Sequence, residues 1–298
     1  MSEVCSQDKV LELLASLNVW KRGDARAPHK PLLMLLALGR LGAGAGRLAT
    51  FEDWATPLAK LLEEFGPPRK TVHTEYPFWR LQADQLWEVP ENGKLTRGRG
   101  NADPLKSEFI KFQVKGGFPE PVYEAFRRNP LLVREAAKQI LNAHFPASVH
   151  SEILDAVGLD MELPSDRVRH PSFRSEVLEA YGHACAFCGY SVRLGNADLG
   201  LDGAHIMWYQ AGGPDISSNG LAVCSLHHRA LDRGAISISD DLTALVSASV
   251  HGGVGIVEFF TSLVGKRLRD PNLVEANARR EYLAWHRKEV FRGPARNL

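Results

Sequence analysis

The chain has 298 residues, with 36 Lys and Arg against 35 Asp and Glu and a formal net charge of +1 at pH 7. This length exceeds what one hydrophobic core usually serves, so two domains are expected. Of the four cysteines, Cys5 stands alone and the other three belong to one metal-binding pattern described below, so no disulfide framework is available. No apolar run approaches membrane-spanning length or forms a secretory signal after Met1, so a soluble, cytoplasmic protein is expected.

Apolar periodicity with start and stop signals predicts four helices in the first half of the chain, over Val10 to Val19, Leu32 to Leu41, Phe51 to Phe65 and Asn129 to Leu141. Pro31 occupies a first-turn position before the second of them. Thr50 and Asp53 have the spacing of an N-cap and its partner before the third. Two short runs, Phe78-Trp79-Arg80-Leu81 and Leu86-Trp87-Glu88-Val89, alternate around a polar turn and predict a β-hairpin.

A change of composition divides the chain near its middle. Residues 158–171 carry Pro, Asp and Arg that interrupt any apolar period, which indicates a linker. We therefore predict an α+β protein, with a mainly helical N-terminal DNA-binding domain and a small sheet at 1–157 and a second domain at 172–298 that ends in a basic helix. Phe173 to Tyr181 is predicted to be the helix that leads into the second domain.

Two short clips of metal-binding residues lie in the second domain. Cys185-x-x-Cys188 flanks a turn, and Cys224-x-x-His227 repeats the same spacing further along. A structural zinc site takes four soft or borderline ligands and has no open position, and these four residues supply such a set. The alternative is that the thiols are buried and free.

A second group of residues has the chemistry of a hydrolytic site. Metal-dependent hydrolysis of a phosphodiester needs a base, a group that aims the base, and a divalent ion on the scissile phosphate. His205 is the candidate base because it lies in the apolar run Gly203–Met207, which predicts a strand with one polar side chain. His228 begins a predicted helix that runs to Asp232, and Asn219-Gly220 is a strong turn dipeptide.

The clips and these three residues, in this order, resemble the His-Asn-His (HNH) endonucleases over residues 171–245. The resemblance implies a zinc-stabilised ββα-metal finger that hydrolyses DNA. In it His205 would be the base, and Asn219 would hold that histidine through a hydrogen bond to the backbone beside it. His228 would bind the catalytic divalent cation, magnesium or manganese.

Two features depart from the family pattern. Most members carry a cysteine where this chain has His227, although imidazole is an equally good zinc ligand. Asp202 precedes the base by three residues rather than by one, and Asp232 lies one helical turn beyond His228 and could share its face. Either carboxylate could be the second ligand of the catalytic ion, or simply a solvated or capping group.

Three stretches of the first domain resemble the sulfur-binding domains that precede an HNH nuclease in the McrA-type, modification-dependent restriction enzymes. They are Arg26-Ala27-Pro28-His29-Lys30-Pro31-Leu32-Leu33, Glu75-Tyr76-Pro77-Phe78-Trp79-Arg80-Leu81 and Arg97-Gly98-Arg99-Gly100-Asn101-Ala102-Asp103-Pro104. The resemblance implies binding of double-stranded DNA in which sulfur replaces one non-bridging phosphate oxygen.

The residue types in these stretches suit that ligand. Sulfur is larger, more polarisable and less strongly hydrated than oxygen, so its recognition needs an apolar cup, which Tyr76 and Pro77 would supply. His29 and Lys30 would hold the phosphate charge, and Arg99 would reach a phosphate or a guanine edge. The alternative is that Tyr76 and Pro77 belong to an ordinary aromatic core cluster, and that His29 and Lys30 are only the polar start of a helix.

Charge is unevenly distributed along the chain. The segment Gly93–Gly117 carries six Lys and Arg against two acidic residues, and Lys266–Leu298 carries nine against four. Two basic regions fit a protein that contacts the phosphate backbone at more than one place, although solvated surfaces would give the same pattern.

The combined prediction is a type IV, modification-dependent restriction endonuclease that binds phosphorothioated DNA and cuts nearby with a metal-dependent HNH site. One alternative is an HNH endonuclease directed to another modified base, such as methylcytosine, or to a specific sequence. Another is a zinc-stabilised DNA-binding protein without catalysis. Cutting both strands with one site per chain usually takes two chains, so a homodimer is a further expectation.

Overall fold

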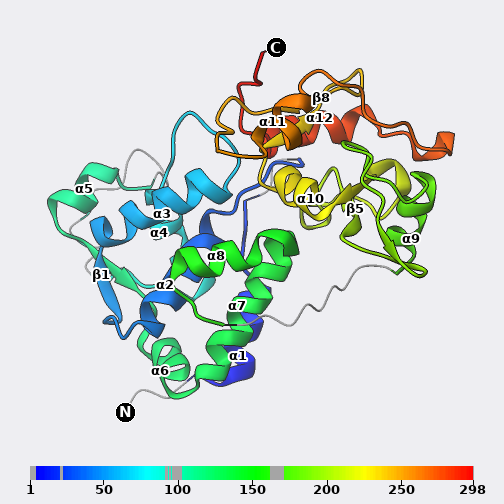
Figure 1. Ribbon diagram of the computed structural model, residues 1–298. Helices are drawn as coiled ribbons and strands as arrows, with labels where there is room; N and C mark the ends of the chain where they lie inside the picture. Colours follow the sequence, from blue (N-terminus) through cyan, green and yellow to red (C-terminus); the bar gives the residue numbers. More distant parts are fainter. Residues whose placement is uncertain are drawn as a thin grey trace. The chain divides into compact units, whose positions relative to one another are not determined.

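The computed structural model describes residues 5–20, 23–90, 93, 95, 103–161 and 171–297 (Figure 1). The chain forms two compact units. The first unit comprises Met1–Arg22, Ala27–Phe145 and His150–Pro164, and the second comprises Gly23–Arg26, Pro146–Val149 and Ser165–Leu298. Arg99 and most of the predicted linker at 158–171 lie outside the described residues.

The first unit is built from helices and one small sheet. Its α-helices are α1 (Gln7–Ala15), α2 (His29–Gly42), α3 (Phe51–Phe65), α4 (Glu75–Arg80), α5 (Lys106–Lys111), α6 (Glu120–Arg128), α7 (Pro130–His144) and α8 (His150–Val157). A 3-10 helix, η1 (Leu81–Asp84), continues from α4. Strand β1 (Leu48–Thr50) pairs antiparallel with β2 (Lys115–Gly117). The four predicted helices of this part are all present, with α1 ending earlier than expected.

Helix α2 is the centre of the first unit. Every residue from Pro31 to Gly39 is buried, as expected of a helix that is apolar on all sides, and the helix contacts α3, α4, α7 and α8. Helix α8 approaches so closely that a Cβ at Gly39 would lie 1.8 Å from the carbonyl oxygen of Val157. The predicted cap of α3 is a full capping box between Thr50 and Asp53.

The predicted hairpin over residues 78–89 is wrong. Its first run lies in α4 and η1, and in its second run Glu88 forms an isolated bridge to Gly117. Phe78 and Leu81 are both fully buried, and residues three apart share one face of a helix. A run of four residues is too short for this spacing to be told from strand alternation.

The second unit contains a β-β-α element, formed by β5 (Leu201–His205), β6 (Gly220–Cys224) and α10 (Ser225–Asp232). Strands β5 and β6 are antiparallel, with His205 opposite Gly220. The other elements are η3 (Ala147–Val149), α9 (Pro171–Ala180), β3 (Arg193–Leu194), β4 (Ala197–Asp198), η4 (Tyr209–Ala211), η5 (Ser217–Asn219), β7 (Ile236–Ile238), β8 (Ala244–Val246), α11 (Ile256–Phe259), η6 (Thr261–Leu263), η7 (Val274–Ala276) and α12 (Arg280–Glu289). The α+β prediction is confirmed. Strand β5, which ends in His205, begins and ends two residues earlier than expected, and α10 begins three residues earlier.

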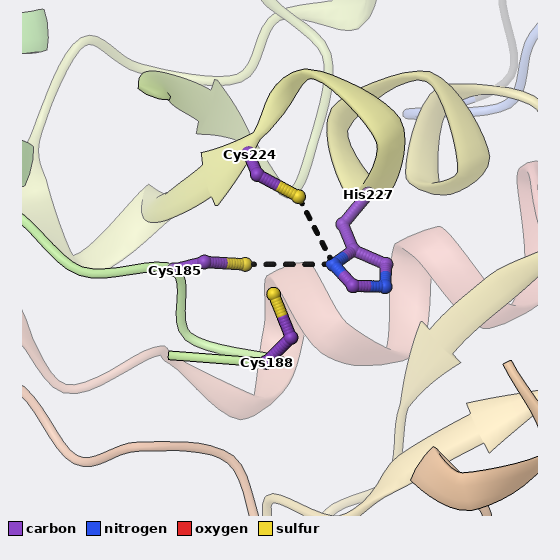
Figure 2. A group of neighbouring side chains, drawn as sticks. All are labelled: Cys185, Cys188, Cys224 and His227. Carbon is purple, nitrogen blue, oxygen red and sulfur yellow. Dashed lines mark hydrogen bonds between the residues drawn. The ribbon is translucent and has the colours of Figure 1, made fainter. Parts of the chain in front are cut away.

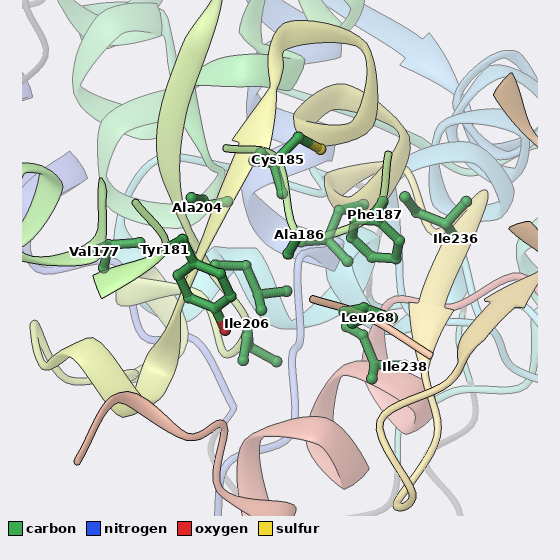
Figure 3. Packing of buried hydrophobic residues seen from close by; sticks show 14 of the residues in the cluster. Val177, Tyr181, Cys185, Ala186, Phe187, Ala204, Ile206, Ile236, Ile238 and Leu268 are labelled. Atoms are coloured by element: carbon green, nitrogen blue, oxygen red, sulfur yellow. The ribbon is translucent and has the colours of Figure 1, made fainter. Parts of the chain in front are cut away.

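Helix α9 covers the β5–β6 hairpin and forms part of the core in Figure 3. Gly203 and Gly220 allow this close packing, because a Cβ at Gly220 would lie 2.3 Å from a methyl group of Val177. Phe173 of α9 is fully buried. The helix therefore supports the strand that ends in His205.

Candidate functional site

The four predicted zinc ligands come together in the second unit (Figure 2). Cys185 and Cys188 lie in the loop after α9, Cys224 ends β6, and His227 is in the first turn of α10. Their ligand atoms all lie within 4.8 Å of one another. Nδ1 of His227 is 3.5 Å from Sγ of Cys185 and 3.2 Å from Sγ of Cys224. This arrangement could hold one zinc ion with no open position.

The surroundings of His227 favour a metal on its Nδ1 atom. Its Nε2 donates a hydrogen bond to the carbonyl oxygen of Phe259 at 3.0 Å, and this bond leaves Nδ1 with the lone pair that a metal needs. Without a cation, the hydrogen bond with Cys185, followed by burial, raises the pKa of Cys224 to about 11. A bound divalent cation reverses this effect, because it stabilises the thiolate. The donor set therefore fits zinc.

His205 lies at the end of β5 and is held on two sides. Its Nε2 atom is 2.7 Å from Oδ1 of Asp215. Its ring stacks on Phe173, with centroids 4.0 Å apart and an angle of 13° between the planes. Only 14% of the His205 side chain is exposed. The imidazole thus has a fixed plane and one ring nitrogen bound to a carboxylate.

Asn219 is fully buried and fastens the loop that follows His205. Its Oδ1 accepts a hydrogen bond from the backbone N–H of Met207 at 2.9 Å. Its Nδ2 donates to the carbonyl oxygens of Met207 and Pro214, each at 3.0 Å. The hydrogen bond expected between Asn219 and the backbone beside the base is therefore present at Met207, and the same side chain also holds the far end of the loop.

His228, on α10, lies between the two aspartates named as rival ligands. Its Nδ1 is 3.5 Å from Oδ2 of Asp202, and its Nε2 is 3.3 Å from Oδ2 of Asp232. Both carboxylates are buried, and that of Asp232 also accepts a hydrogen bond from Ser148. Because the carboxylates approach opposite ring nitrogens, one ion on His228 can share only one of them.

Strand geometry explains how Asp202 reaches His228. Side chains alternate along a strand, so positions one and three residues before His205 point to the same face. Asp202 therefore lies on the face that carries the aspartate in family members with a direct Asp-His pair. Arg174 of α9 also contacts Asp202, with its Nε 3.2 Å from Oδ1.

In the first unit, Tyr76 lies on α4 with 39% of its surface exposed. Its ring stacks on His73 with centroids 4.7 Å apart, and the guanidinium of Arg80 lies 4.6 Å from the ring centroid. Pro77, the other predicted member of the apolar cup, is buried. Tyr76 is thus the member of the predicted pair that presents an aromatic surface.

His29 and Lys30 begin α2. Burial, and next the neighbouring His73, lower the pKa of His29, so its ring is neutral at pH 7 and offers hydrogen bonds rather than charge. Nζ of Lys30 lies 2.5 Å from Oδ2 of Asp84. The charge of Lys30 is therefore balanced within the protein.

Residues 7–162 match the ScoMcrA-like, DNA sulfur-binding domain. The chain belongs to this family. Residues 185–239 match the HNH endonuclease family, and this range contains the zinc cluster, His205, Asn219 and His228. The predicted resemblance, with a sulfur-binding domain followed by an HNH domain, is confirmed.

Several solved structures resemble the sulfur-binding part of this chain. The sulfur binding domain of ScoMcrA complexed with phosphorothioated DNA is 27% identical, with a TM-score of 0.43 over 50% of this chain and 94% of that one. The sulfur binding domain of SprMcrA, also complexed with phosphorothioated DNA, is 19% identical, with a TM-score of 0.44 over 52% and 95%. The type IV phosphorothioation-dependent restriction endonuclease ScoMcrA is 26% identical, with a TM-score of 0.42, and the match covers 49% of this chain and 31% of that protein.

None of the curated proteins matches this chain. No helix among the described residues is long and apolar enough to cross a membrane.

Several contacts to the predicted site residues were not foreseen from the sequence, among them those of Arg174 to Asp202 and Ser148 to Asp232. Asp215 and Phe173 contact His205, and His73 and Arg80 contact Tyr76. For Arg80 the signal was available, because it lies four residues after Tyr76 on the same helix face. For Asp215 no spacing rule applies, since an irregular loop brings it to the ring.

Proposed function

We propose that this chain is a type IV, modification-dependent restriction endonuclease that binds phosphorothioated DNA and hydrolyses nearby phosphodiester bonds at a metal-dependent HNH site. The observation that carries the proposal is the union, in one chain, of a domain of the sulfur-binding family with an HNH domain that retains His205, Asn219 and His228. A zinc-stabilised DNA reader without catalysis would need only the four zinc ligands. We assign recognition to residues 1–157, the linker to 158–171 and catalysis to 172–298.

In this proposal His205 takes a proton from the water that attacks the phosphorus atom. Phe173 and the Asn219-fastened loop keep the imidazole in one orientation, so no reorganisation is needed when the proton moves. The ring is partly exposed, which gives water access to it.

The residues around His228 fit a hard divalent cation such as magnesium or manganese. We propose that Nδ1 of His228 and the carboxylate of Asp202 are its protein ligands, since the two groups face each other. Asp232 then acts from the other side by accepting a hydrogen bond from Nε2–H, which orients the ring. Two protein ligands suit magnesium, which keeps several waters and binds substrate phosphates. When bound, the ion would stabilise charge on the scissile phosphate as a Lewis acid.

For recognition we propose that Tyr76, fixed by its neighbours on α4, forms the apolar surface that meets the sulfur. Pro77 beneath it shapes the start of that helix, and the neutral His29 ring donates a hydrogen bond to the modified phosphate. We retain Lys30 and Arg99 as candidate phosphate contacts. The ion pair of Lys30 with Asp84 means that its role needs a test of its own.

The decisive experiment compares two duplexes of identical sequence, with and without one phosphorothioate, incubated with the full chain and manganese. We expect cleavage near the sulfur and much weaker cleavage of the plain duplex. A third duplex carrying methylcytosine tests the alternative target. Equal cleavage of the sulfur-bearing and plain duplexes would reject the proposal that this chain recognises phosphorothioate. Tight binding without any cleavage would favour a zinc-stabilised DNA-binding protein without catalysis.

A further inference from the structure

We infer that Asp215 is the positioning carboxylate of the His205 base, and that Asn219 acts on the base by holding the loop that delivers Asp215. The inference rests on the proposed function, in which His205 deprotonates water. It assigns to Asp215 a role in catalysis without contact with the DNA. Three features of the structure carry it: the edge contact to the ring, the packing of the ring face, and the construction of the loop.

The edge contact determines which ring nitrogen is the base. Oδ1 of Asp215 lies 2.7 Å from Nε2 of His205, and an ionised carboxylate can only accept hydrogen bonds. Nε2 therefore carries the proton in the neutral ring, and Nδ1 keeps the lone pair. Nδ1 is thus the nitrogen that can take a proton from water.

The same carboxylate also stabilises the product of the proton transfer. When Nδ1 takes a proton, the ring becomes an imidazolium, and the negative charge of Asp215 is already in contact with it. In serine proteases an aspartate paired with the catalytic histidine acts in this way, and its replacement by asparagine lowers the rate because the tautomer becomes wrong.

The ring cannot escape this contact by turning. Phe173 stacks on it at 4.0 Å with the planes 13° apart, and Phe173 is itself fully buried in α9. A rotation about the Cα–Cβ bond of His205 would lose both the stack and the hydrogen bond, and a half-turn of the ring about the Cβ–Cγ bond would lose the hydrogen bond. Helix α9 therefore holds the face of the His205 ring through Phe173, and the loop after β5 holds its edge through Asp215.

The loop between Met207 and Asp215 is built to reach the ring. Gly212 has a φ of 92°, a conformation that favours glycine. A Cβ at Gly213 would lie 1.9 Å from the carbonyl oxygen of Met207 and 2.9 Å from Nδ2 of Asn219. The turn therefore has no room for a side chain at this position.

Asn219 closes the loop at both ends. Its Nδ2 donates to the carbonyl oxygen of Met207, and also to that of Pro214, the residue directly before Asp215. Because Asn219 is fully buried, these bonds are not exchanged with water. The amide of Asn219 thus places the carboxylate of Asp215 on the base.

The test uses the full chain with Asp215→Asn, assayed by single-turnover cleavage of a phosphorothioated duplex with manganese. Asparagine is nearly isosteric, but its amide can donate to Nε2 and so favour the tautomer with the proton on Nδ1. We expect the cleavage rate to fall by about 10²- to 10⁴-fold, with unchanged affinity for DNA in fluorescence anisotropy. Asp215→Glu keeps the acceptor and should recover part of the rate.

A spectroscopic readout separates positioning from general support of the fold. In ¹⁵N-histidine-labelled protein the wild-type His205 ring should show a protonated Nε2, and Asp215→Asn should shift it toward protonated Nδ1. Asp198→Asn is the matched control, because Asp198 pairs with His183 at 2.8 Å in the same unit. It removes an Asp–His contact of the same kind and should leave the cleavage rate unchanged.

The outcomes keep this inference apart from the proposed function. If His205→Ala is inactive while Asp215→Asn cuts at the wild-type rate with an unchanged tautomer, the role of Asp215 is rejected and the nuclease assignment stands. If His205→Ala cuts normally, the proposed function itself fails. If Asp215→Asn does not fold, Asp215→Ser, which removes the carboxylate with a smaller side chain, is judged by the same rate and the same tautomer.

Discussion

His205 and His228 belong to the same β-β-α element, yet their contacts differ. His205 has one carboxylate at Nε2 and an aromatic ring on its face. His228 has a carboxylate near each nitrogen. One histidine is thus suited to exchange a proton with water, and the other to hold a cation together with one of its two carboxylate neighbours.

His205→Ala should lower the rate of DNA cleavage by at least about 10²-fold, since it removes the general base. Affinity for phosphorothioated DNA should stay unchanged, because recognition is assigned to the first unit. Single-turnover cleavage and fluorescence anisotropy measure the two properties separately. His251→Ala, at an exposed histidine of the same unit, is the control. A His205→Ala variant that cuts at a near-normal rate would remove this residue from the mechanism.

Lys30→Met should destabilise the protein by about 3 to 5 kcal/mol, because it leaves the Asp84 carboxylate buried without its partner. The two side chains are only 13% and 3% exposed. Urea denaturation measures the change, and Lys30→Met combined with Asp84→Asn should recover much of the loss.

The control for this prediction is Lys9→Met, whose partner Glu12 and own side chain are 69% and 54% exposed. That change should cost less than about 1 kcal/mol. If Lys30→Met is as stable as the wild type and binds DNA weakly, Lys30 contacts phosphate and the ion pair contributes little to stability.

At the scale of elements, the zinc cluster joins the loop after α9 to the junction of β6 and α10. The loop that carries Cys185 and Cys188, the end of β6 and the start of α10 meet at this cluster. Between Cys188 and β5 the chain contains little regular structure other than the short strands β3 and β4. A bound metal would therefore contribute binding free energy directly to the folding of this part.

Cys188→Ser should lower the melting temperature and the yield of soluble protein, because it removes one of the four ligands. Elemental analysis of the wild-type protein should find about one zinc per chain that survives dialysis. Cys5→Ser, in the first unit, removes a thiol outside the cluster and should change neither property. A wild-type protein that is fully stable without zinc would contradict the assignment.

Helix α12 is fixed to its neighbours through a buried histidine. Nε2 of His286 donates to the carbonyl oxygen of Leu231 at 3.0 Å, and its Nδ1 lies 2.8 Å from the hydroxyl of Ser237. Burial is the largest cause that lowers the pKa of His286 to about 4. The neutral ring is thus the form compatible with the fold.

The pH dependence of stability should reflect this histidine. In the unfolded chain His286 has its ordinary pKa of 6.5, whereas in the folded chain its pKa is about 4. Stability should therefore be complete above pH 6.5 and fall by about 3 kcal/mol as the pH drops through this window. In His286→Gln, which retains a donor, this part of the slope should vanish in urea denaturation at stepped pH. An unchanged slope would mean that other groups cause it.

At the scale of the whole molecule, the residues that match the sulfur-binding family and those that match the HNH family fall largely in separate compact units. The basic C-terminal region is partly neutralised in the structure. Arg287 pairs with Asp240 at 2.5 Å, and Arg267 pairs with Asp270 at 2.9 Å. Net positive charge along the sequence therefore overstates the charge available to DNA.

Tyr76→Ala should reduce the preference for sulfur-bearing over plain DNA by about tenfold, the effect of roughly 1.4 kcal/mol of lost aromatic contact. General affinity, which depends on charge and weakens with salt, should change little. Anisotropy with paired duplexes at two salt concentrations separates the two effects. Trp20→Ala removes another exposed aromatic side chain of the first unit and serves as the control. An undiminished preference would place the sulfur contact elsewhere.

Short-range chemistry could be predicted from the sequence. The Cys-x-x-Cys and Cys-x-x-His clips, the Thr50–Asp53 capping box and the apolar period of α2 each depend on residues within a few positions of one another. Their geometry follows from local backbone conformation, so residue types at fixed spacing were sufficient. The order of the HNH residues added the family, and through it the candidates for the base, the amide and the metal-binding histidine.

Tertiary structure alone decided the contacts between distant residues. Asp215 reaches His205 through a glycine turn, Lys30 pairs with Asp84, and Phe78 lies in helix α4, where its ring packs on those of Phe51 and Phe109. Such contacts depend on how loops and helices pack, and no local spacing encodes them. The sequence therefore determined which reactive groups the chain carries, and packing decided which carboxylate contacts which ring nitrogen, because such contacts join residues that no local spacing relates.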